Sequence, residues 1–299
     1  MAASLVPSPR VGAVARPIRD WISVFKPRIL VLLVAVAVVS GLVGAREGVP
    51  WGSIALLAMS GTIASASASL LNNYRDRDID AIMDRTRTRP LATGRINARA
   101  ALIVGILLLV SGTVLALLVN VWSGVFVLSG ALIYAVVYSY GLKRRTAWNI
   151  VIGGLAGSCA VLAGWSAVST DFNTAAILIA AILFLWTPCH FWSFALVHQE
   201  SYRKAKVPML PVVAGEKKTS GYVLLHAVLL LLVSVLLYVF SDLGIVYLVG
   251  ALICSLVFVT TSFRLFRSFD RGRAWRNYKL SGVYLLGLFA SMLLATLVR

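Results

Sequence analysis

Nine long apolar stretches constrain this chain more than any other feature, because each is near the length that a helix needs to cross a bilayer. They are predicted at residues 29–45, 52–72, 98–119, 124–141, 149–168, 174–198, 220–240, 244–263 and 280–298. The residues are 60% hydrophobic and only 13% charged, and strand-like alternation is absent. We therefore expect an all-α integral membrane protein, with residues 1–28 as a cytoplasmic tail and 29–299 as one polytopic domain. Residues 203–221 are predicted to form a loop.

Basic residues mark one side of the predicted membrane. With the N-terminus in the cytoplasm, the tail and the loops after the second, fourth, sixth and eighth spans hold all but two of the 28 Lys and Arg residues, the exceptions being Arg46 and Arg299. This asymmetry follows the positive-inside rule, so the net charge of +17 requires no nucleic-acid partner. We expect a multi-pass protein of the inner cell membrane with its C-terminus outside.

A ladder of polar residues stands at the end of the second span. Asn72, Asp76, Asp80 and Asp84 recur every four residues, a step that drifts only about 40° around a helix, so they are predicted to share one helix face. Like charges at this spacing repel each other. Carboxylate and amide oxygens suit Mg²⁺, which commonly bridges carboxylates to substrate phosphates. The pattern predicts a metal site, and a solvated mixed-charge loop is the alternative.

Basic side chains follow the ladder on the same side of the membrane. Arg85 and Arg89 lie in the next loop, and Lys143 and Arg144 follow the fourth span. Such side chains bind phosphate oxygens through charge-assisted hydrogen bonds. Together with the ladder they indicate a metal–diphosphate site, although a role in membrane orientation alone explains them too.

The sixth span is unusually aromatic and carries two histidines. Pro188 is expected to kink or break its helix. His190 and His198 are eight residues apart, about 80° around a helix, so they could face one cavity beside Trp186 and Trp192. An ionisable residue in a membrane span is a functional hypothesis, with hydrogen-bonded packing as the alternative. The aromatic setting suits a large, flat, apolar substrate.

These features resemble the UbiA superfamily of intramembrane prenyltransferases. Its first motif, Asn-x3-Asp-x3-Asp, is matched by Asn72, Asp76 and Asp80. Within the superfamily the chain is most similar to the haem-farnesylating branch. The matching stretches run in order along most of the chain, at residues 76–80, 85–91, 142–149, 186–192 and 207–213.

The resemblance implies a fold and a reaction. The fold would be a bundle of nine helices around a central cavity open to the cytoplasmic side. The reaction would transfer the farnesyl group of farnesyl diphosphate to a vinyl group of haem B, forming a hydroxyethylfarnesyl group and releasing diphosphate. Mg²⁺ would be the counter-ion of the diphosphate. The product would supply respiratory terminal oxidases, with haem A synthase or a terminal-oxidase assembly as partner.

The resemblance also implies roles for individual residues. Catalysis would depend on Asn72, Asp76 and Asp80, and these three with Asp84 would bind the metal. The diphosphate would be bound by Arg85, Arg89, Lys143 and Arg144. Haem binding or lining of the cavity would fall to His190, His198, Trp186, Trp192 and Tyr138.

The chain departs from the pattern of that family in one region. The second aspartate-rich motif is not evident at residues 190–202, where Ser201 replaces a common Asp and Cys189 replaces a common Pro. Glu200 is the candidate for a second acidic contact. Two alternatives stay open. One is another UbiA-type prenyltransferase acting on 4-hydroxybenzoate or a chlorophyllide. The other, from a different class, is a transporter of an anionic metabolite.

Overall fold

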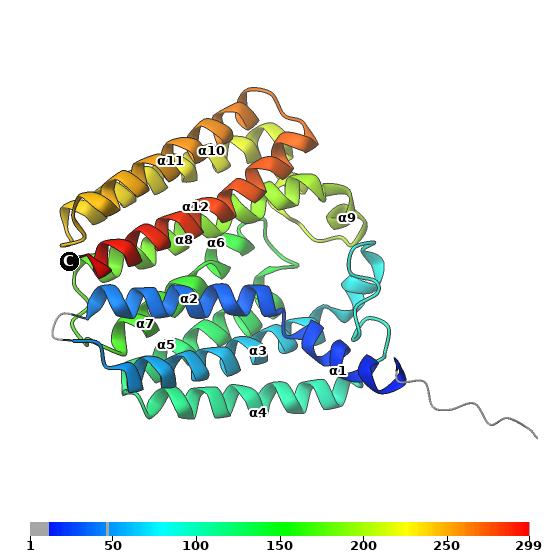
Figure 1. The fold of residues 1–299 in the computed structure, drawn as a ribbon. Coiled ribbons are helices and arrows are strands. Elements are labelled where there is room, and N and C mark those ends of the chain that lie inside the picture. Colours follow the sequence, from blue (N-terminus) through cyan, green and yellow to red (C-terminus); the bar gives the residue numbers. More distant parts are fainter. Residues whose placement is uncertain (1–11, 46–47, 299) are drawn as a thin grey trace, which may run out of the picture.

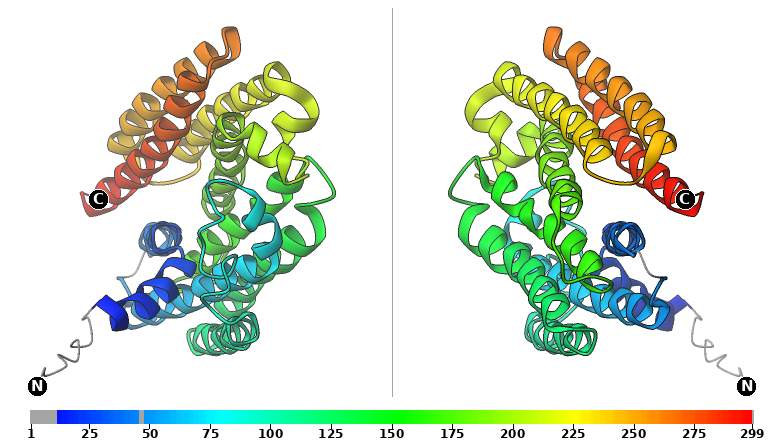
Figure 2. Two further views of the ribbon diagram at one scale, coloured as in Figure 1. Left: turned by 90° about the vertical axis from the view of Figure 1, so that its right-hand side faces the viewer. Right: turned by 90° about the vertical axis from the view of Figure 1, so that its left-hand side faces the viewer.

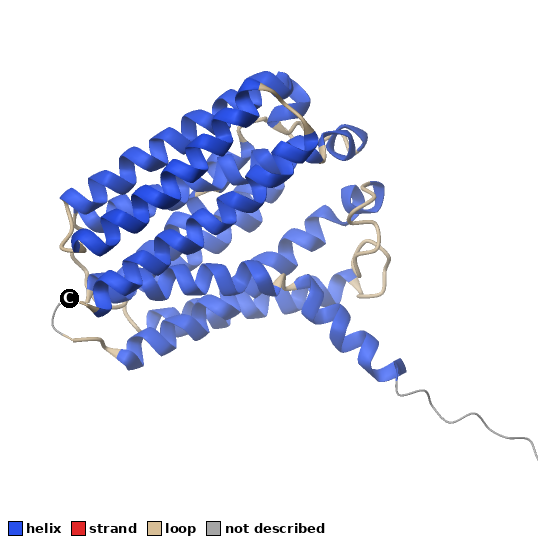
Figure 3. Ribbon diagram, turned by 45° about the horizontal axis from the view of Figure 1, so that its top comes forward, coloured by secondary structure: helices blue, strands red, loops and turns tan. Residues whose placement is uncertain are grey.

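The described part of the chain is helical throughout. A computed structural model describes residues 12–45 and 48–298, and no strand occurs within them (Figure 3). Nine helices in these ranges are long and apolar enough to cross a membrane, as the sequence predicts. Arg46, Arg299 and the first eleven residues of the predicted tail lie outside the described residues.

Most membrane helices begin and end close to the predicted apolar stretches. They are α2 (Pro27–Gly44), α3 (Trp51–Ile82), α4 (Ala98–Leu117), α5 (Val121–Leu132) continued by the π-helix η1 (Ile133–Leu142), α6 (Asn149–Gly153) followed by α7 (Leu155–Ser166), α8 (Thr174–Val197), α10 (Leu210–Val239), α11 (Gly244–Arg267) and α12 (Arg271–Leu297). Two shorter helices lie outside them, α1 (Gly12–Val24) and α9 (Gln199–Lys204).

One prediction about helix ends is wrong. The loop expected at residues 203–221 is mostly helix, because α10 begins at Leu210 with Pro211 in its first turn, where proline favours a helix start. Within α10, Gly215 has φ 77°, a left-handed conformation that glycine tolerates, and the helix is kinked there. Helix α8 is not broken at Pro188 but continues to Val197.

The helices lie side by side in one bundle. The short helices α1 and α9 lie at one end of it and the C-terminus at the other, as an odd number of spans requires (Figure 1). Seen along the bundle, α10, α11 and α12 pack together on one side and α2, α3, α4 and α5 on the other (Figure 2). Helices α7 and α8 contact each other and join the two groups.

Small residues allow close approach where α2 crosses α7. A Cβ atom built on Gly164 would lie 1.9 Å from the Ala37 carbonyl oxygen, so the two backbones touch directly. Ser40 Oγ donates to the Val161 carbonyl at 2.9 Å across the same contact. Such contacts are typical of membrane bundles, where packing and hydrogen bonds replace the hydrophobic driving force.

Candidate active site

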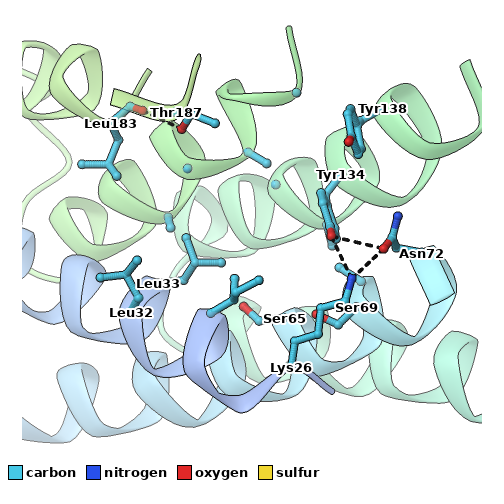
Figure 4. A pocket seen from close by; sticks show the side chains of 18 of the residues that line it. Lys26, Leu32, Leu33, Ser65, Ser69, Asn72, Tyr134, Tyr138, Leu183 and Thr187 are labelled. Carbon is cyan, nitrogen blue, oxygen red and sulfur yellow. Dashed lines mark hydrogen bonds between the residues drawn. The ribbon is translucent and has the colours of Figure 1, made fainter. Parts of the chain in front are cut away.

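A cavity of about 490 Å³ lies among α2, α3, η1, α7 and α8. Its lining includes α3 residues from Leu57 to Asp80, a difference of 23 residues and thus about 35 Å along the helix axis. One end is polar and the rest is mainly apolar. Figure 4 shows Lys26, Asn72 and Tyr134 joined at the polar end, with Leu32 and Leu33 further along the cavity.

Three members of the predicted ladder lie on one buried face of α3. Asn72, Asp76 and Asp80 are 3%, 0% and 4% exposed. The prediction that Asp84 continues this face is wrong, because α3 ends at Ile82 and the next residue is extended. The Thr86 hydroxyl donates to the Asp80 carbonyl at 3.0 Å and so satisfies a backbone group at the helix end. Asp84 is consequently exposed.

The side chain of Asn72 is held in one orientation by four contacts. Its Nδ2 donates to Asp76 Oδ2 at 2.9 Å and to Ser139 Oγ at 2.8 Å. Its Oδ1 accepts from Lys26 Nζ at 2.6 Å and from the Tyr134 hydroxyl at 3.3 Å. Because donors and acceptors are matched on both sides, the amide is ordered before any substrate binds.

The two buried carboxylates of the ladder are paired with cations. Asp76 Oδ2 is bonded to Lys143 Nζ, and Asp80 Oδ2 accepts from Arg89 at 2.8 Å. The sequence analysis assigned a bound cation to the repelling carboxylates, and in the structure these two basic residues supply positive charge to them. They come from separate segments, the end of η1 and the loop after α3.

The donor set fits Mg²⁺. Asp76 Oδ1 is buried and has no hydrogen-bond partner in the described part of the chain, so one carboxylate oxygen is available to a cation. Within residues 12–45 and 48–298, no three His, Cys, Asp or Glu residues form a complete metal site. Mg²⁺ takes one or two protein carboxylates and completes its shell with substrate phosphates and water, so the free Asp76 oxygen suits it.

The predicted phosphate-binding residues divide into two groups. Arg85, Arg89 and Lys143 line the cavity. Arg85 lies 5.1 Å from the centre of the Phe194 ring, in cation–π geometry. Arg144 is not among the lining residues, because its guanidinium binds Asp78 on the outer face of α3 at 2.6 and 2.7 Å. This hydrogen-bonded pairing raises the pKa of Arg144.

Lys26 is a site residue that the sequence analysis did not single out. It lies between α1 and α2 with φ 54°, an uncommon conformation for a residue with a side chain, and its amine points into the polar end of the cavity (Figure 4). Burial, and after it the nearby Arg89 guanidinium, lowers the pKa of Lys26 to about 7. The signal in the sequence that could have identified Lys26 is a lysine and a proline directly before an apolar helix.

The π-helix η1 shapes the wall next to Asn72. Its wider turn stacks Tyr134 on Tyr138 with ring centres 5.7 Å apart and planes 7° apart. Ser139, which contacts Asn72, donates its hydroxyl to the Tyr134 carbonyl at 2.8 Å. Both tyrosines line the cavity, as predicted for Tyr138. π-Helical turns are rare and often occur at functional sites.

An aromatic wall stands further along, on α8 and α12. Trp186, His190, Phe194 and Tyr278 line the cavity there. The His190 ring lies between Trp186, at 4.3 Å between ring centres, and Tyr278, at 4.6 Å. His190 Nδ1 is 2.6 Å from Ser281 Oγ on α12.

Three predicted residues do not line the cavity. Trp192 is two residues, or about 200°, beyond His190 on α8, so it packs against Tyr222 and His226 of α10 instead of facing the cavity. His198 ends α8 and contacts Phe194 and Trp275 without lining the cavity. Burial, and then Arg85, lowers the pKa of His198.

Glu200 is the third of these residues. It is exposed and pairs with Arg203, one turn along α9, at 2.6 Å. It therefore makes no acidic contact in the cavity. The buried Tyr202, two residues further on, lines the cavity, and burial raises the pKa of its phenol to about 12, so the phenol stays protonated at neutral pH.

Comparison with known proteins gives consistent matches over nearly the whole chain. The model of the UbiA prenyltransferase family matches residues 32–292. A protoheme IX farnesyltransferase from Marinobacter nauticus is 41% identical over 277 residues, which are 92% of this chain and 91% of that protein. A protoheme IX farnesyltransferase 1 from Pseudomonas fluorescens is 40% identical over 92% of each chain.

Solved structures show the same fold at lower identity. A digeranylgeranylglyceryl phosphate synthase superposes with a TM-score of 0.80 at 19% identity, over 94% of this chain and 99% of that one. A UbiA homolog from Archaeoglobus fulgidus, bound to GPP and Mg²⁺, superposes with a TM-score of 0.68 at 18% identity, over 91% and 99%.

Proposed function

Because the chain belongs to the UbiA prenyltransferase family, we propose that it transfers the farnesyl group of farnesyl diphosphate to a vinyl group of haem B. The observation that carries the proposal is the cavity itself, in which a carboxylate and cation end is continuous with an aromatic and apolar wall. The first suits a diphosphate and the second a prenyl chain and a porphyrin. The two farnesyltransferases reported above, about 40% identical over most of the chain, favour haem over a smaller aromatic acceptor.

Farnesyl transfer begins with loss of the diphosphate and ends with the addition of water. The bond between farnesyl C1 and the diphosphate oxygen breaks, and its electron pair leaves with the diphosphate. The terminal vinyl carbon bonds to C1, which leaves positive charge on the vinyl carbon next to the porphyrin. Water adds there and releases a proton, giving a hydroxyethylfarnesyl group.

The polar end would support the departure of diphosphate. Asp76 and Asp80, with Asn72 beside them, would hold Mg²⁺, which when bound neutralises charge on the leaving group. Arg85, Arg89 and Lys143 would bind the remaining oxygens. Lys143 and Arg89 would then exchange a carboxylate partner for a phosphate one. Asp84, Arg144 and Glu200 are exposed or paired elsewhere and take no part in this proposal.

The aromatic wall would hold the haem and keep water from the allylic charge. Trp186, His190 and Tyr278 present ring faces or edges to the cavity, and Leu32 and Leu183 continue it as an apolar channel for the prenyl chain. A dry site prevents early capture of a reactive cation by water.

We also propose an orientation in the inner cell membrane. The basic loops lie at the end of the bundle that holds Asp76 and Asp80, so the positive-inside rule places that end, and the diphosphate, in the cytoplasm. The C-terminus would be outside. Single-cysteine labelling in intact cells tests this, and labelling of the 83–97 loop from outside the cell would contradict it.

The first experiment is turnover by purified protein in detergent with haem B, farnesyl diphosphate and Mg²⁺. We expect mass spectrometry of extracted porphyrins to show a farnesyl-plus-water adduct. It should disappear with Asp76→Ala or with a chelator. Asp78→Ala is the matched control, because Asp78 lies on the same helix, is 58% exposed at its side chain, and pairs with Arg144 outside the cavity.

The acceptor is decided in parallel incubations. Prenylation of 4-hydroxybenzoate, with no haem adduct, would keep the family and discard the haem assignment. Movement of an anionic metabolite across proteoliposomes without any prenylated product would discard the enzyme assignment as well.

A further inference from the structure

His190 has a hydrogen-bond arrangement that decides which of its nitrogens carries the proton. Its Nδ1 lies 2.6 Å from Ser281 Oγ, and the same hydroxyl lies 2.7 Å from the Tyr278 carbonyl oxygen one turn earlier on α12. Ser281 is fully buried, so no water competes for these contacts. A serine hydroxyl has a single proton to give.

Only one tautomer satisfies both contacts. A carbonyl oxygen cannot donate, so the Ser281 proton must point to Tyr278, and Ser281 Oγ then accepts a proton from His190 Nδ1–H. In the other tautomer the hydroxyl would point to Nδ1, and two oxygens would face each other at 2.7 Å with no proton between them. Two oxygens that close repel each other unless a proton lies between them, so this arrangement is disfavoured. The neutral His190 ring therefore carries its proton on Nδ1.

The second nitrogen of His190, Nε2, consequently has a free lone pair. Within the described residues, Nε2 has no hydrogen-bond partner, and it is not among the buried unsatisfied atoms, while His190 lines the cavity. Trp186 and Tyr278 hold the ring from two sides, so its plane is fixed. The Trp186 indole in turn donates to the Ser281 carbonyl at 2.8 Å, which ties the wall to α12.

We propose that Ser281 is a positioning residue that holds His190 as the Nδ1–H tautomer, so that Nε2 is the axial ligand of the haem iron. The inference rests on the proposed function, since it requires haem in the cavity. It separates the two histidines of α8, because His198 ends the helix outside the cavity lining and has no such partner. Histidine ligands of metals are commonly oriented by a hydrogen bond from the other ring nitrogen.

The test is resonance Raman spectroscopy of the ferrous haem B complex of the full-length protein in detergent, together with a haem titration. We expect an iron–histidine stretching band in the wild type that is lost in His190→Ala and unchanged in His198→Ala. Added imidazole should restore a ligand in His190→Ala. In Ser281→Ala the band should move to lower frequency and haem affinity should fall roughly 10- to 100-fold.

Matched variants separate positioning from folding. Ser291→Ala removes a hydroxyl from the same helix with the same contact, 2.7 Å to the carbonyl three residues earlier, but with no histidine attached, so the band should not move. Ser281→Thr keeps the hydroxyl and should keep the band. If Ser281→Ala does not fold, Ser281→Cys, with a weaker acceptor, carries the same expectation.

Failure of this inference differs from failure of the proposed function. A band that persists in His190→Ala, or that is identical in the wild type and Ser281→Ala, would overturn the inference even if farnesyl transfer proceeds. Conversely, a wild type that shows the expected band but yields no farnesyl adduct would leave the ligand assignment standing and discard the reaction.

Discussion

At the scale of the residue, Lys143 directly follows η1, pairs with the Asp76 carboxylate of α3 and lines the cavity. We expect Lys143→Ala to lower kcat/KM for farnesyl diphosphate roughly 100-fold, because a preorganised donor to a leaving group is worth that much in other enzymes. Arg145→Ala is the control, since Arg145 is exposed two residues further on. The measurement is steady-state kinetics at saturating Mg²⁺. Equal losses of kcat/KM in the two variants would count against a direct role of Lys143 at the diphosphate.

Lys26 tests whether the orientation of Asn72 matters. Removing the amine in Lys26→Ala leaves Asn72 Oδ1 with only the longer contact to Tyr134, so the amide is held less firmly against Asp76. We expect the Mg²⁺ concentration for half-maximal turnover to rise about tenfold, whereas Arg28→Ala, two residues on and exposed, should leave it unchanged. An unaltered Mg²⁺ requirement in Lys26→Ala would show that Asn72 is held without it.

Which side chains reach the cavity could be predicted only in part. The spacing of Asn72, Asp76 and Asp80 was enough to predict that their side chains share one face, because residues four apart lie on the same face of a helix. The spacing gives no warning that α3 stops before Asp84, since that depends on Thr86 closing the helix end. Nor does the spacing predict that Arg144 pairs with Asp78, since the two residues are 66 positions apart in the chain. Such choices depend on tertiary neighbours.

At the scale of the helix, the α2–α7 crossing depends on the absence of one methyl group. Gly164→Ala would place a Cβ against the Ala37 carbonyl, and because this is backbone it cannot rotate away. We expect a loss of about 1–3 kcal/mol and a lower melting temperature in detergent. Gly282→Ala on α12, where nothing lies within 4 Å, should be neutral or slightly stabilising. The reverse order of melting temperatures would contradict the packing argument.

Helix positions were predictable where apolar sequence alone decides them. The ends of α4 and α8 fall within two residues of the predicted spans. The predicted apolar stretches are shorter than α3, α10 and α12, because each helix extends into a polar segment that a hydropathy pattern does not include. The π-helix was not predictable, since the residues of η1 would suit an α-helix equally well.

At the scale of the whole molecule, the length of the cavity should select the prenyl donor. Ala160 lines the apolar part, so Ala160→Phe would shorten the space for the chain without touching the polar end. We expect turnover with geranylgeranyl and farnesyl diphosphates to fall by about tenfold or more while geranyl diphosphate is less affected. Ala55→Phe, on the exposed face of α3, is the control. Parallel losses with all three donors would contradict this assignment.

The pairing of Asp76 with Lys143 and of Asp80 with Arg89 has a physiological consequence. Since the protein carries its own counter-charges, the bundle does not depend on an external ion to assemble or persist, and metal depletion should abolish turnover while leaving the melting temperature unchanged. A cell short of magnesium would then keep folded but inactive protein in its membrane. Supply could resume as soon as the ion returned, with no new synthesis.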